Sequence, residues 1–313
     1  MIDSNKDLLG IKQLSAGCIS QILTNAAAMK YALLSGTKKM PHLTGKSMVT
    51  LFCENSTRTR LSFELAGKYL GANVSNVSAG GSSLLKGESL LDTARTIDAM
   101  QADVIVIRHP MSGTPHFIAK HVRAAVINGG DGMDEHPTQA LLDAFTIKEK
   151  KGELAGLKVA IVGDVAHSRV ARSNIYLLNK MGAKVSVGAP ATLLPPEFDR
   201  LGAVTYTSTH EAILDADVVM GLRIQSERQQ EGLFPSIREY SRFFGIDNRR
   251  MMLAKKDALI MHPGPVNRGV EYAGSTVDSP ASVINEQVTN GVAVRMAVLN
   301  MILKRGIASE NND

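Results

Sequence analysis

The chain contains two successive series in which short apolar runs alternate with helical patterns. In the first series the predicted strands lie near 47–53, 73–77, 103–108 and 124–127. Helical spacing separates them, near 57–70, 88–100 and 114–122, and another helix opens at Pro137. Strands that alternate with helices form parallel sheets with right-handed crossovers. We therefore expect an α/β fold.

A second alternation follows a charged, glycine-containing stretch at 149–152, which is typical of a domain junction. Its predicted strands lie near 158–164, 183–189, 216–222 and 257–263. A chain of 313 residues is long enough for two cores. We expect two domains, residues 1–148 and 152–288, each with a central parallel β-sheet flanked by helices. A final helical pattern covers residues 290–306.

Composition limits the class of protein. The formal charge of +5 is modest, and a basic site for a small acidic molecule explains it as well as nucleic acid would. No aromatic stacking platform accompanies the arginines, which argues against nucleic acid. The N-terminus lacks a signal-like apolar segment, and no run approaches the length of a membrane span. We expect a cytoplasmic protein without membrane or nucleic-acid partners.

The two cysteines, Cys18 and Cys53, predict no metal or redox chemistry. They form no C-x-x-C motif, and no His/Cys cluster has the spacing of a metal site. Both lie in apolar periodic segments, where buried free thiols are typical of a reducing compartment. No metal and no cofactor are expected.

Five consecutive donor-bearing residues, Ser56, Thr57, Arg58, Thr59 and Arg60, stand where a predicted strand gives way to a helix. A helix N-terminus presents unpaired backbone N–H groups and the positive end of a dipole. A simple N-cap explains Ser56 or Thr57 alone. Two arginines in a first turn are unfavourable there unless an anion binds, so we expect a phosphate site.

Further polar residues follow other predicted strands of the first half. Arg108 comes directly after the run DVIVI, and His136 precedes a proline at the expected first position of a helix, with Gln139 on the same turn. A neutral imidazole there could donate to a carbonyl oxygen. Alone, Arg108 is more typical of a surface arginine, and His136 is equally typical of an N-cap without a chemical role. In parallel sheets ligands bind beyond the carboxyl ends of strands, so the shared position strengthens the site hypothesis.

The remaining candidate residues come from a glycine- and serine-rich loop and from the second half. The loop at 80–88 offers Ser82 and the long cation of Lys86, but it is not a Walker A motif. After later strands come Arg169, then Arg223 and Gln225, and finally the turn His262, Pro263, Gly264 and Pro265. The segment that ends in Arg169 lacks G-x-G-x-x-G spacing, which argues against a dinucleotide site. Arg223 and Gln225 suit a carboxylate held by two groups. Two prolines leave the last turn with carbonyls that could accept from an amine.

In order along the chain, STRTR, the Ser82–Lys86 loop, RHP, HPTQ, Arg169, R-x-Q and HPGP resemble the carbamoyltransferase family over essentially all 313 residues. The late HPGP turn lacks the cysteine of ornithine-type members, and Arg223 and Gln225 suit a side-chain carboxylate rather than an ammonium. The resemblance therefore favours members that use aspartate, with an ornithine-type or other amine carbamoyltransferase as the alternative.

The resemblance implies a role for each matching residue. The phosphate of carbamoyl phosphate would be held by Ser56, Thr57, Arg58 and Thr59. The carbamoyl oxygen would be polarised by Thr59, Arg108 and His136, and its amide would donate to Gln139. Aspartate would be held by Arg169, Arg223 and Gln225, and its amine would be oriented by the carbonyls at Gly264 and Pro265. A cis bond before Pro265 is also implied.

The resemblance further implies a homotrimer in which Ser82 and Lys86 reach a neighbouring subunit's site. Only the spacing to Lys86 favours Ser82 over Ser83 in this role, so the choice between the two serines stays open. Further assembly with regulatory or dihydroorotase chains stays open. The last helix would pack back onto the first domain. The implied reaction is carbamoyl transfer to the α-amine of L-aspartate, a step of pyrimidine biosynthesis. The other hypothesis, outside enzymes, is a phosphate-ligand or nucleic-acid binding module without turnover.

Overall fold

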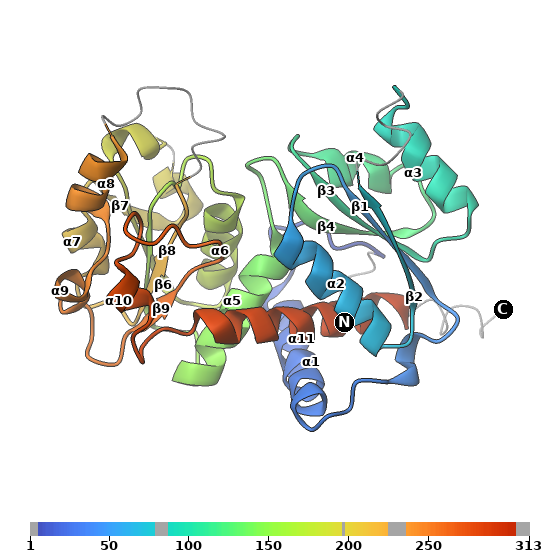
Figure 1. The fold of residues 1–313 in the computed structure, drawn as a ribbon, viewed down its shortest axis with the longest axis horizontal. Coiled ribbons are helices and arrows are strands. Elements are labelled where there is room, and N and C mark those ends of the chain that lie inside the picture. Colours follow the sequence, from blue (N-terminus) through green and yellow to red (C-terminus); the bar gives the residue numbers. More distant parts are fainter. Residues whose placement is uncertain (1–5, 79–86, 196–197, 225–235, 305–313) are drawn as a thin grey trace. The chain divides into compact units, whose positions relative to one another are not determined.

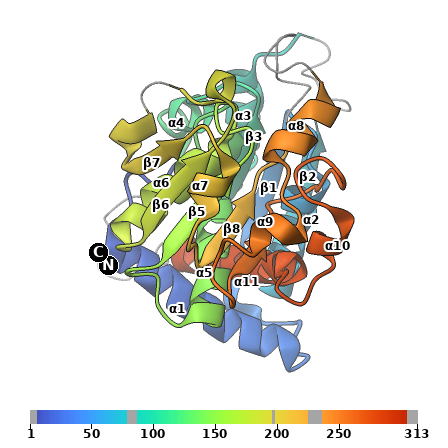
Figure 2. The same ribbon diagram turned by 90° about the vertical axis from the view of Figure 1, so that its left-hand side faces the viewer.

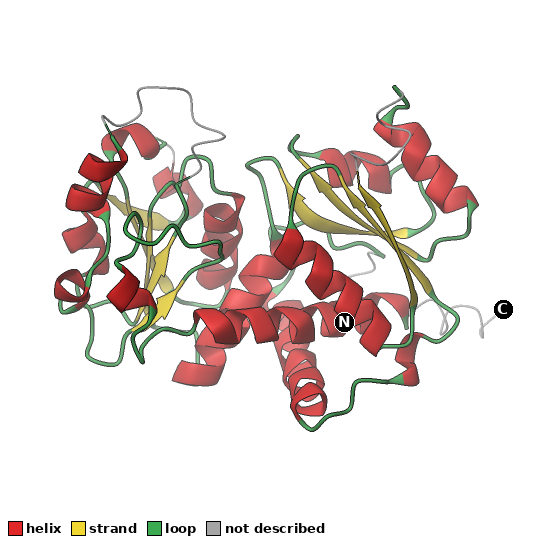
Figure 3. Cartoon of the chain, in the orientation of Figure 1, coloured by secondary structure: helices red, strands yellow, loops and turns green. Residues whose placement is uncertain are grey.

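The computed structural model describes residues 6–78, 87–195, 198–224 and 236–304. The chain divides into two compact units. Unit 1 comprises residues 1–141 and 288–313, and unit 2 comprises residues 142–287. Two helices, α5 (Pro137–Lys151) and α11 (Ile284–Leu303), contain residues of both units. Figure 1 colours the chain by sequence, and Figure 3 separates its helices from its strands.

Unit 1 contains a four-stranded parallel sheet in the order β2-β1-β3-β4. The strands are β1 (Ser47–Phe52), β2 (Asn73–Ser78), β3 (Val104–His109) and β4 (Ala125–Asp131). The apolar β3 is central and buried, whereas β2 carries the polar sequence NVSNVS at an edge. A continuous apolar run suits a strand covered on both faces, and a polar one suits an edge. The sequence therefore predicted this sheet correctly.

Helices cover both faces of the first sheet (Figures 1 and 3). One face packs against α3 (Leu90–Ala99) and α4 (Thr114–Ala119) through a core that includes Leu51, Ile97, Ile105, Ile118 and Val126. Residues of α1 (Ala16–Leu34), α2 (Thr57–Tyr69) and α11 complete the unit.

Helix α2 approaches the sheet closely at Gly67. A Cβ at this position would come within 2.8 Å of side-chain carbons of Met48 on β1 and Val74 on β2. The absence of a side chain therefore lets the helix backbone lie directly over both strands. The guanidinium of Arg295 on α11 lies 5.0 Å from the centre of the Phe63 ring on α2, at cation–π distance.

Unit 2 contains a five-stranded parallel sheet in the order β7-β6-β5-β8-β9 (Figure 2). The strands are β5 (Lys158–Val162), β6 (Lys184–Gly188), β7 (Ala203–Tyr206), β8 (Val218–Gly221) and β9 (Leu259–Met261). The sequence predicted only four of these strands. The missed strand, β7, is a four-residue edge strand in which only Ala203 is fully buried, so it lacks the long buried apolar run that marks the others.

The helices of unit 2 are α6 (Arg169–Lys180), α7 (Thr209–Ile213), α8 (Ile237–Phe244), α9 (Asn248–Met251) and α10 (Gly274–Val277). One core joins strand residues such as Val162, Val219 and Ile260 to Ile213 of α7 and to Tyr272. The Tyr272 hydroxyl lies 3.0 Å from the Val219 carbonyl and 3.3 Å from the Met261 carbonyl, so a single ring contacts two neighbouring strands.

Candidate active site

The STRTR segment opens helix α2, as the sequence predicted. Ser56 is the N-cap, and its Oγ accepts from the Thr59 backbone N–H at 3.3 Å. Thr57 is the first helical residue, and the side chains of Thr57, Arg58 and Arg60 are exposed. An exposed guanidinium beside the free N–H groups of a helix N-terminus is suited to bind an anion.

Thr59 and His136 lie together although 77 positions separate them in sequence. Thr59 Oγ1 is 3.4 Å from His136 Nε2, and the two residues are only 7% and 4% exposed. His136 directly precedes Pro137, the first residue of α5, and its carbonyl accepts from the Gln139 backbone N–H at 3.0 Å. Gln139 is also buried. The structure thus brings a hydroxyl, an imidazole and an amide residue to the carboxyl ends of β1 and β4.

Arg108 lies at the same edge of the sheet, one residue before the end of β3. Its Nη1 donates to the Gly129 carbonyl at 3.3 Å, and its Nη2 contacts Glu54 Oε1 at 3.2 Å. The backbone N–H of Cys53 donates to the Arg108 carbonyl at 2.8 Å, which places Glu54 beside the arginine. Glu54 was not among the predicted site residues. Its position directly after an apolar strand was the available signal.

His109, next to Arg108, has a structural rather than a site-like environment. Burial lowers the pKa of His109, while the Met111 backbone N–H, which donates to its Nδ1 at 3.0 Å, and nearby carboxylates oppose that effect. Its Nδ1 also lies 3.1 Å from Thr114 Oγ1. The neutral imidazole therefore holds the turn that leads into α4.

In unit 2, Arg169 is the first residue of α6 and follows β5 along the chain. The N-cap Ser168 accepts from the Ala171 backbone N–H at 3.1 Å. Arg169 is buried, which is uncommon for an arginine. The sequence prediction that Arg169 follows a strand is confirmed, and the structure adds that it opens a helix.

Arg223 follows β8, and a buried carboxylate fixes the backbone beside it. Glu271 Oε1 accepts from the Ile224 backbone N–H and from Asn267 Nδ2, both at 2.8 Å, while its Oε2 accepts from the Asn267 backbone N–H at 2.8 Å. Burial raises the pKa of Glu271, and these hydrogen bonds oppose the effect. Glu271 was not among the predicted site residues, because nothing in its local sequence pattern shows that it folds back onto Ile224.

The HPGP turn follows β9, and two hydrogen bonds of His262 hold its beginning. His262 Nδ1 accepts from the Gly264 backbone N–H at 2.8 Å, and the His262 backbone N–H donates to Gln287 Oε1 at 3.0 Å. Gly264 has φ +71°, which glycine adopts readily, and the Gly264–Pro265 bond is cis, as the resemblance implied.

Three buried side chains, linked by hydrogen bonds, continue from the His262 backbone N–H into the interior of unit 2. Gln287 Nε2 donates to Asp143 Oδ1 at 2.7 Å, and Asn174 Nδ2 donates to Asp143 Oδ2 at 2.8 Å. All three side chains are buried. No sequence pattern indicated this link, because Asp143 and Gln287 are 144 positions apart.

Three predicted site residues, Ser82, Lys86 and Gln225, lie outside the described residues. A cavity of about 680 Å³ on unit 2 contains none of the predicted site residues; it is lined by residues that include His210, Arg242 and Arg249. The candidate chemistry instead follows neighbouring strands: β1, β3 and β4 in unit 1, and β5, β8 and β9 in unit 2.

Two family profiles match this sequence, one in each half of the chain. The profile described as "Aspartate/ornithine carbamoyltransferase, carbamoyl-P binding domain" matches residues 6–149. The profile described as "Aspartate/ornithine carbamoyltransferase, Asp/Orn binding domain" matches residues 155–302. The chain belongs to the aspartate/ornithine carbamoyltransferase family.

Individual members of the family resemble the chain end to end. The aspartate carbamoyltransferase catalytic subunit of Acetivibrio thermocellus is 66% identical over 305 residues, covering 97% of this chain and 98% of the relative. The crystal structure of aspartate transcarbamoylase from Trypanosoma cruzi in complex with N-(phosphonacetyl)-L-aspartic acid has a TM-score of 0.85 at 32% identity, covering 95% of each chain.

Ornithine carbamoyltransferase from Pyrococcus furiosus also reaches a TM-score of 0.85 at 32% identity, covering 96% of this chain and 97% of that one. The backbone of this carbamoyltransferase family member therefore does not separate the aspartate and ornithine branches. The aspartate branch is favoured by the 66% identity with the Acetivibrio thermocellus catalytic subunit, against 32% with this ornithine enzyme.

The structure also describes the cysteines and the lengths of the helices. Both cysteines are free thiols, Cys18 buried and Cys53 half-buried. Among the helices within the described ranges, none has the length and apolar character needed to cross a membrane.

Proposed function

We propose that this chain transfers the carbamoyl group of carbamoyl phosphate to the α-amine of L-aspartate, giving N-carbamoyl-L-aspartate and phosphate, in the de novo synthesis of pyrimidines. The observation that carries the proposal is the end-to-end identity of 66% with a relative named aspartate carbamoyltransferase catalytic subunit. The helix N-terminus at Ser56 and the buried Thr59–His136 pair supply groups that this reaction needs.

In unit 1 the proposed ligand is carbamoyl phosphate. The phosphate oxygens accept from the N-terminus of α2 and from the side chains of Ser56, Thr57, Arg58 and Thr59. The Thr59 hydroxyl, His136 and Arg108 surround the carbamoyl oxygen, and Gln139 accepts from its amide. Support comes from the 3.4 Å contact of Thr59 with His136 and from their burial, because donors in a dry site stabilise developing charge more strongly than donors in water.

The Arg108–Glu54 ion pair orients one of the proposed catalytic groups. The guanidinium is held between a carboxylate and the Gly129 carbonyl, so it is oriented before any ligand binds. Orientation in advance reduces the reorganisation that the reaction would otherwise require. Glu54 is therefore a positioning residue for Arg108.

In unit 2 the proposed ligand is L-aspartate. Arg169 meets the α-carboxylate, and Arg223 with Gln225 meets the β-carboxylate. The carbonyls of Gly264 and Pro265 orient the amine. Support comes from the way Glu271 fixes the backbone after Arg223 and from the hydrogen bonds that hold the HPGP turn.

The chemistry needs no covalent enzyme intermediate. The aspartate nitrogen attacks the carbamoyl carbon, a tetrahedral oxyanion forms, the carbon–oxygen bond to phosphate breaks, and the leaving phosphate takes the amine proton. The protein holds two anions together and stabilises the oxyanion. Binding two anions and stabilising an oxyanion both need positive charge, which is consistent with the arginine-rich set of candidate residues.

We propose that the working form is a homotrimer in the cytoplasm, with Ser82 and Lys86 completing the site of a neighbouring subunit, and that it either stands alone or joins regulatory or dihydroorotase chains. A light-scattering mass of about 100 kDa, three times the 33.6 kDa of one chain, is expected for the trimer alone. A monomeric mass with full activity would contradict the shared site.

Arg58→Ala tests the proposed function. Loss of one preorganised charged donor reduces turnover by about 10² to 10³. Lys68→Ala is the matched control, because it removes the same charge from the far end of α2, where Lys68 pairs with Glu64. Release of phosphate and formation of N-carbamoyl-L-aspartate are measured together, with circular dichroism to verify folding. Near-normal turnover in Arg58→Ala would falsify the phosphate assignment.

A panel of amines separates the two branches of the family. L-aspartate is expected to be carbamoylated and L-ornithine is not, because the proposed side-chain contacts are a guanidinium and an amide that favour a carboxylate. Faster turnover with ornithine would shift the assignment to the other branch.

A further inference from the structure

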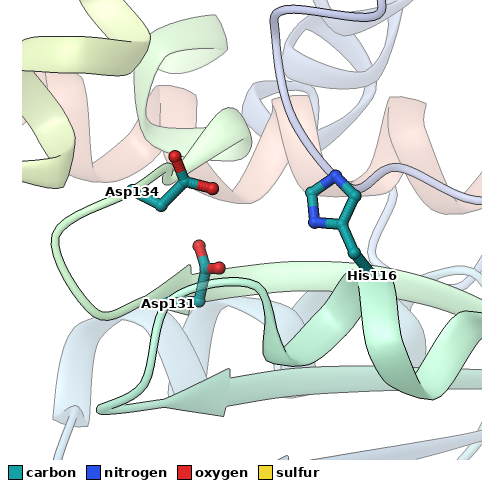
Figure 4. A group of neighbouring side chains, drawn as sticks. All are labelled: His116, Asp131 and Asp134. Atoms are coloured by element: carbon teal, nitrogen blue, oxygen red, sulfur yellow. The ribbon is translucent and has the colours of Figure 1, made fainter.

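Three side chains able to bind a metal ion meet beyond the carboxyl end of β4. They are His116 on α4, Asp131 at the end of β4, and Asp134 in the turn that follows. One ligand atom from each lies within 4.8 Å of the others. Figure 4 shows the carboxylates of Asp131 and Asp134 one above the other, with one ring nitrogen of His116 on the side that faces them. None of these residues belongs to the proposed substrate site.

Asp131 is the rigid member of this group. It has no exposed surface. Its Oδ2 accepts from the Gly113 backbone N–H at 2.7 Å, and its Oδ1 accepts from Asn128 Nδ2 at 2.8 Å and from the Glu135 backbone N–H at 3.2 Å. Within the described residues, no lysine or arginine forms an ion pair with it. A buried carboxylate that is fixed by hydrogen bonds and has no cationic partner is the kind of anchor that metal sites use.

His116 and Asp134 are the adjustable members. Both are partly exposed. His116 Nε2 lies 3.2 Å from Gln13 Nε2, so an amide group contacts one ring nitrogen, and Figure 4 shows the second nitrogen on the side of the carboxylates. Zinc distances of about 2.0 to 2.2 Å place neighbouring ligand atoms about 3.5 Å apart. Rotations of the His116 and Asp134 side chains that move their ligand atoms by about 1 Å would bring the ligand atoms to the separation that zinc requires.

The donor set indicates the class of ion. One imidazole nitrogen and two carboxylate oxygens suit a borderline divalent ion such as Zn²⁺, which commonly takes three protein ligands and one water. Mg²⁺ prefers oxygen ligands in an octahedral arrangement and keeps most of its waters. The imidazole therefore distinguishes this group from an ordinary acidic cluster.

We propose that His116, Asp131 and Asp134 form a binding site for one Zn²⁺ ion. The ion would link α4 to the turn at 131–135, which leads directly into His136 and the start of α5. Its role is to stabilise that turn. The proposal is independent of carbamoyl transfer, and the sequence did not suggest it, because the ligands have none of the short His/Cys spacings of zinc motifs.

Calorimetric titration of the full-length, chelator-treated protein with zinc chloride tests the proposal. Wild type is expected to bind one Zn²⁺ per chain, and His116→Ala and Asp134→Asn are expected to bind at least about tenfold more weakly. Asp131 is not the residue to replace, because its three hydrogen bonds also shape the turn. His121→Ala is the matched control: His121 is an exposed histidine just beyond α4, and its Nδ1 contacts the Phe117 carbonyl at 2.8 Å.

The outcomes are distinct. Binding that is lost in His116→Ala and Asp134→Asn but kept in His121→Ala supports the site. Equal binding in all variants, or none in wild type, overturns it, and equal affinity for Mg²⁺ overturns the choice of ion. Thermal midpoints provide a second measurement, because an ion that binds only the folded chain raises the midpoint of wild type and not that of His116→Ala. Neither measurement uses substrate, so failure here is distinct from failure of the proposed enzyme activity.

Discussion

Replacing Gln287 probes how unit 2 holds the HPGP turn. The Gln287 side chain donates to Asp143 at 2.7 Å and accepts from the His262 backbone N–H at 3.0 Å. Asn174 donates to the other oxygen of Asp143, and all these groups are buried. Gln287→Ala removes both bonds from an interior where neither partner has ready access to water. We therefore expect a large loss of stability.

The expected loss of stability follows from the two groups that lose their partner, the Asp143 carboxylate and the His262 backbone N–H. A hydrogen bond to a charged group contributes about 1.5 to 3 kcal/mol, and a buried backbone N–H without a partner costs about 1 to 3 kcal/mol. Together they predict a loss of about 2.5 to 6 kcal/mol in the free energy of unfolding, a large part of the roughly 5 to 15 kcal/mol typical of a domain. For a unit of this size, the thermal midpoint should fall by about 10 °C.

Gln287→Glu adds a pH dependence with a definite sign. In its protonated form the introduced carboxyl group can still donate to Asp143 and accept from His262, whereas its ionised form cannot donate and faces a second carboxylate. The neighbouring charge raises the folded-state pKa of the introduced carboxyl group above its unfolded value. The stabilising contribution is then present below the unfolded pKa and is lost as pH rises through the folded pKa. The midpoint of Gln287→Glu should therefore approach that of wild type as the pH is lowered from about 8 to about 5.

Differential scanning calorimetry of wild type, both variants and Gln21→Ala provides the measurement. Gln21 is exposed on α1, so its replacement is expected to change stability by less than about 0.5 kcal/mol. A Gln287→Ala midpoint equal to that of Gln21→Ala would refute the reasoning. So would a Gln287→Glu variant whose deficit relative to wild type does not shrink on acidification.

Three further predictions concern other parts of the chain. Partial burial raises the pKa of Asp103, but the Ser47 backbone N–H and the Lys46 ammonium outweigh this effect and hold the pKa below its usual value of 3.8. The contribution of this carboxylate to the free energy of unfolding is present above pH 3.8 and is lost as the pH falls through the lower pKa of the folded state. The acid unfolding of Asp103→Asn should therefore depend less on pH than that of wild type. Burial raises the pKa of the Cys53 thiol, so iodoacetamide should modify it more slowly at about pH 8 in the folded chain than in urea, as peptide mass spectrometry would measure; faster modification when folded would contradict this. Tyr272→Phe removes a buried hydroxyl that contacts two strand carbonyls and should cost about 1 to 3 kcal/mol in urea unfolding; an unchanged midpoint would show that neither contact stabilises the sheet.

The sequence predicted most of the sheet architecture and the positions of several polar residues, because both depend on local pattern. Apolar runs mark the buried strands, and residues just beyond them fall at one sheet edge. It missed β7, a strand of only four residues at the edge of the sheet, which is too short to give a clear apolar run. It also placed the start of the last helix at 290, whereas α11 begins at Ile284.

The supporting residues could not be predicted in the same way. Glu54 contacts Arg108 across 54 positions, and Glu271 contacts Ile224 across 47. Such contacts depend on how loops fold back, and no periodic pattern encodes that. The same applies to the group of His116, Asp131 and Asp134, which adjacent packing of α4 and the end of β4 brings together.

The division of the chain between the two units affects the order in which they can fold during synthesis. Unit 2 is continuous from Leu142 to Gln287, and the Asp143–Gln287 hydrogen bond of 2.7 Å shows that its two ends meet. Unit 1 includes the segment from Val288 onward, which the ribosome makes after unit 2. The complete sequence of unit 2 is therefore available first, although unit 1 begins the chain. A nascent chain that stops before Val288 contains a full unit 2 and a unit 1 that lacks most of α11.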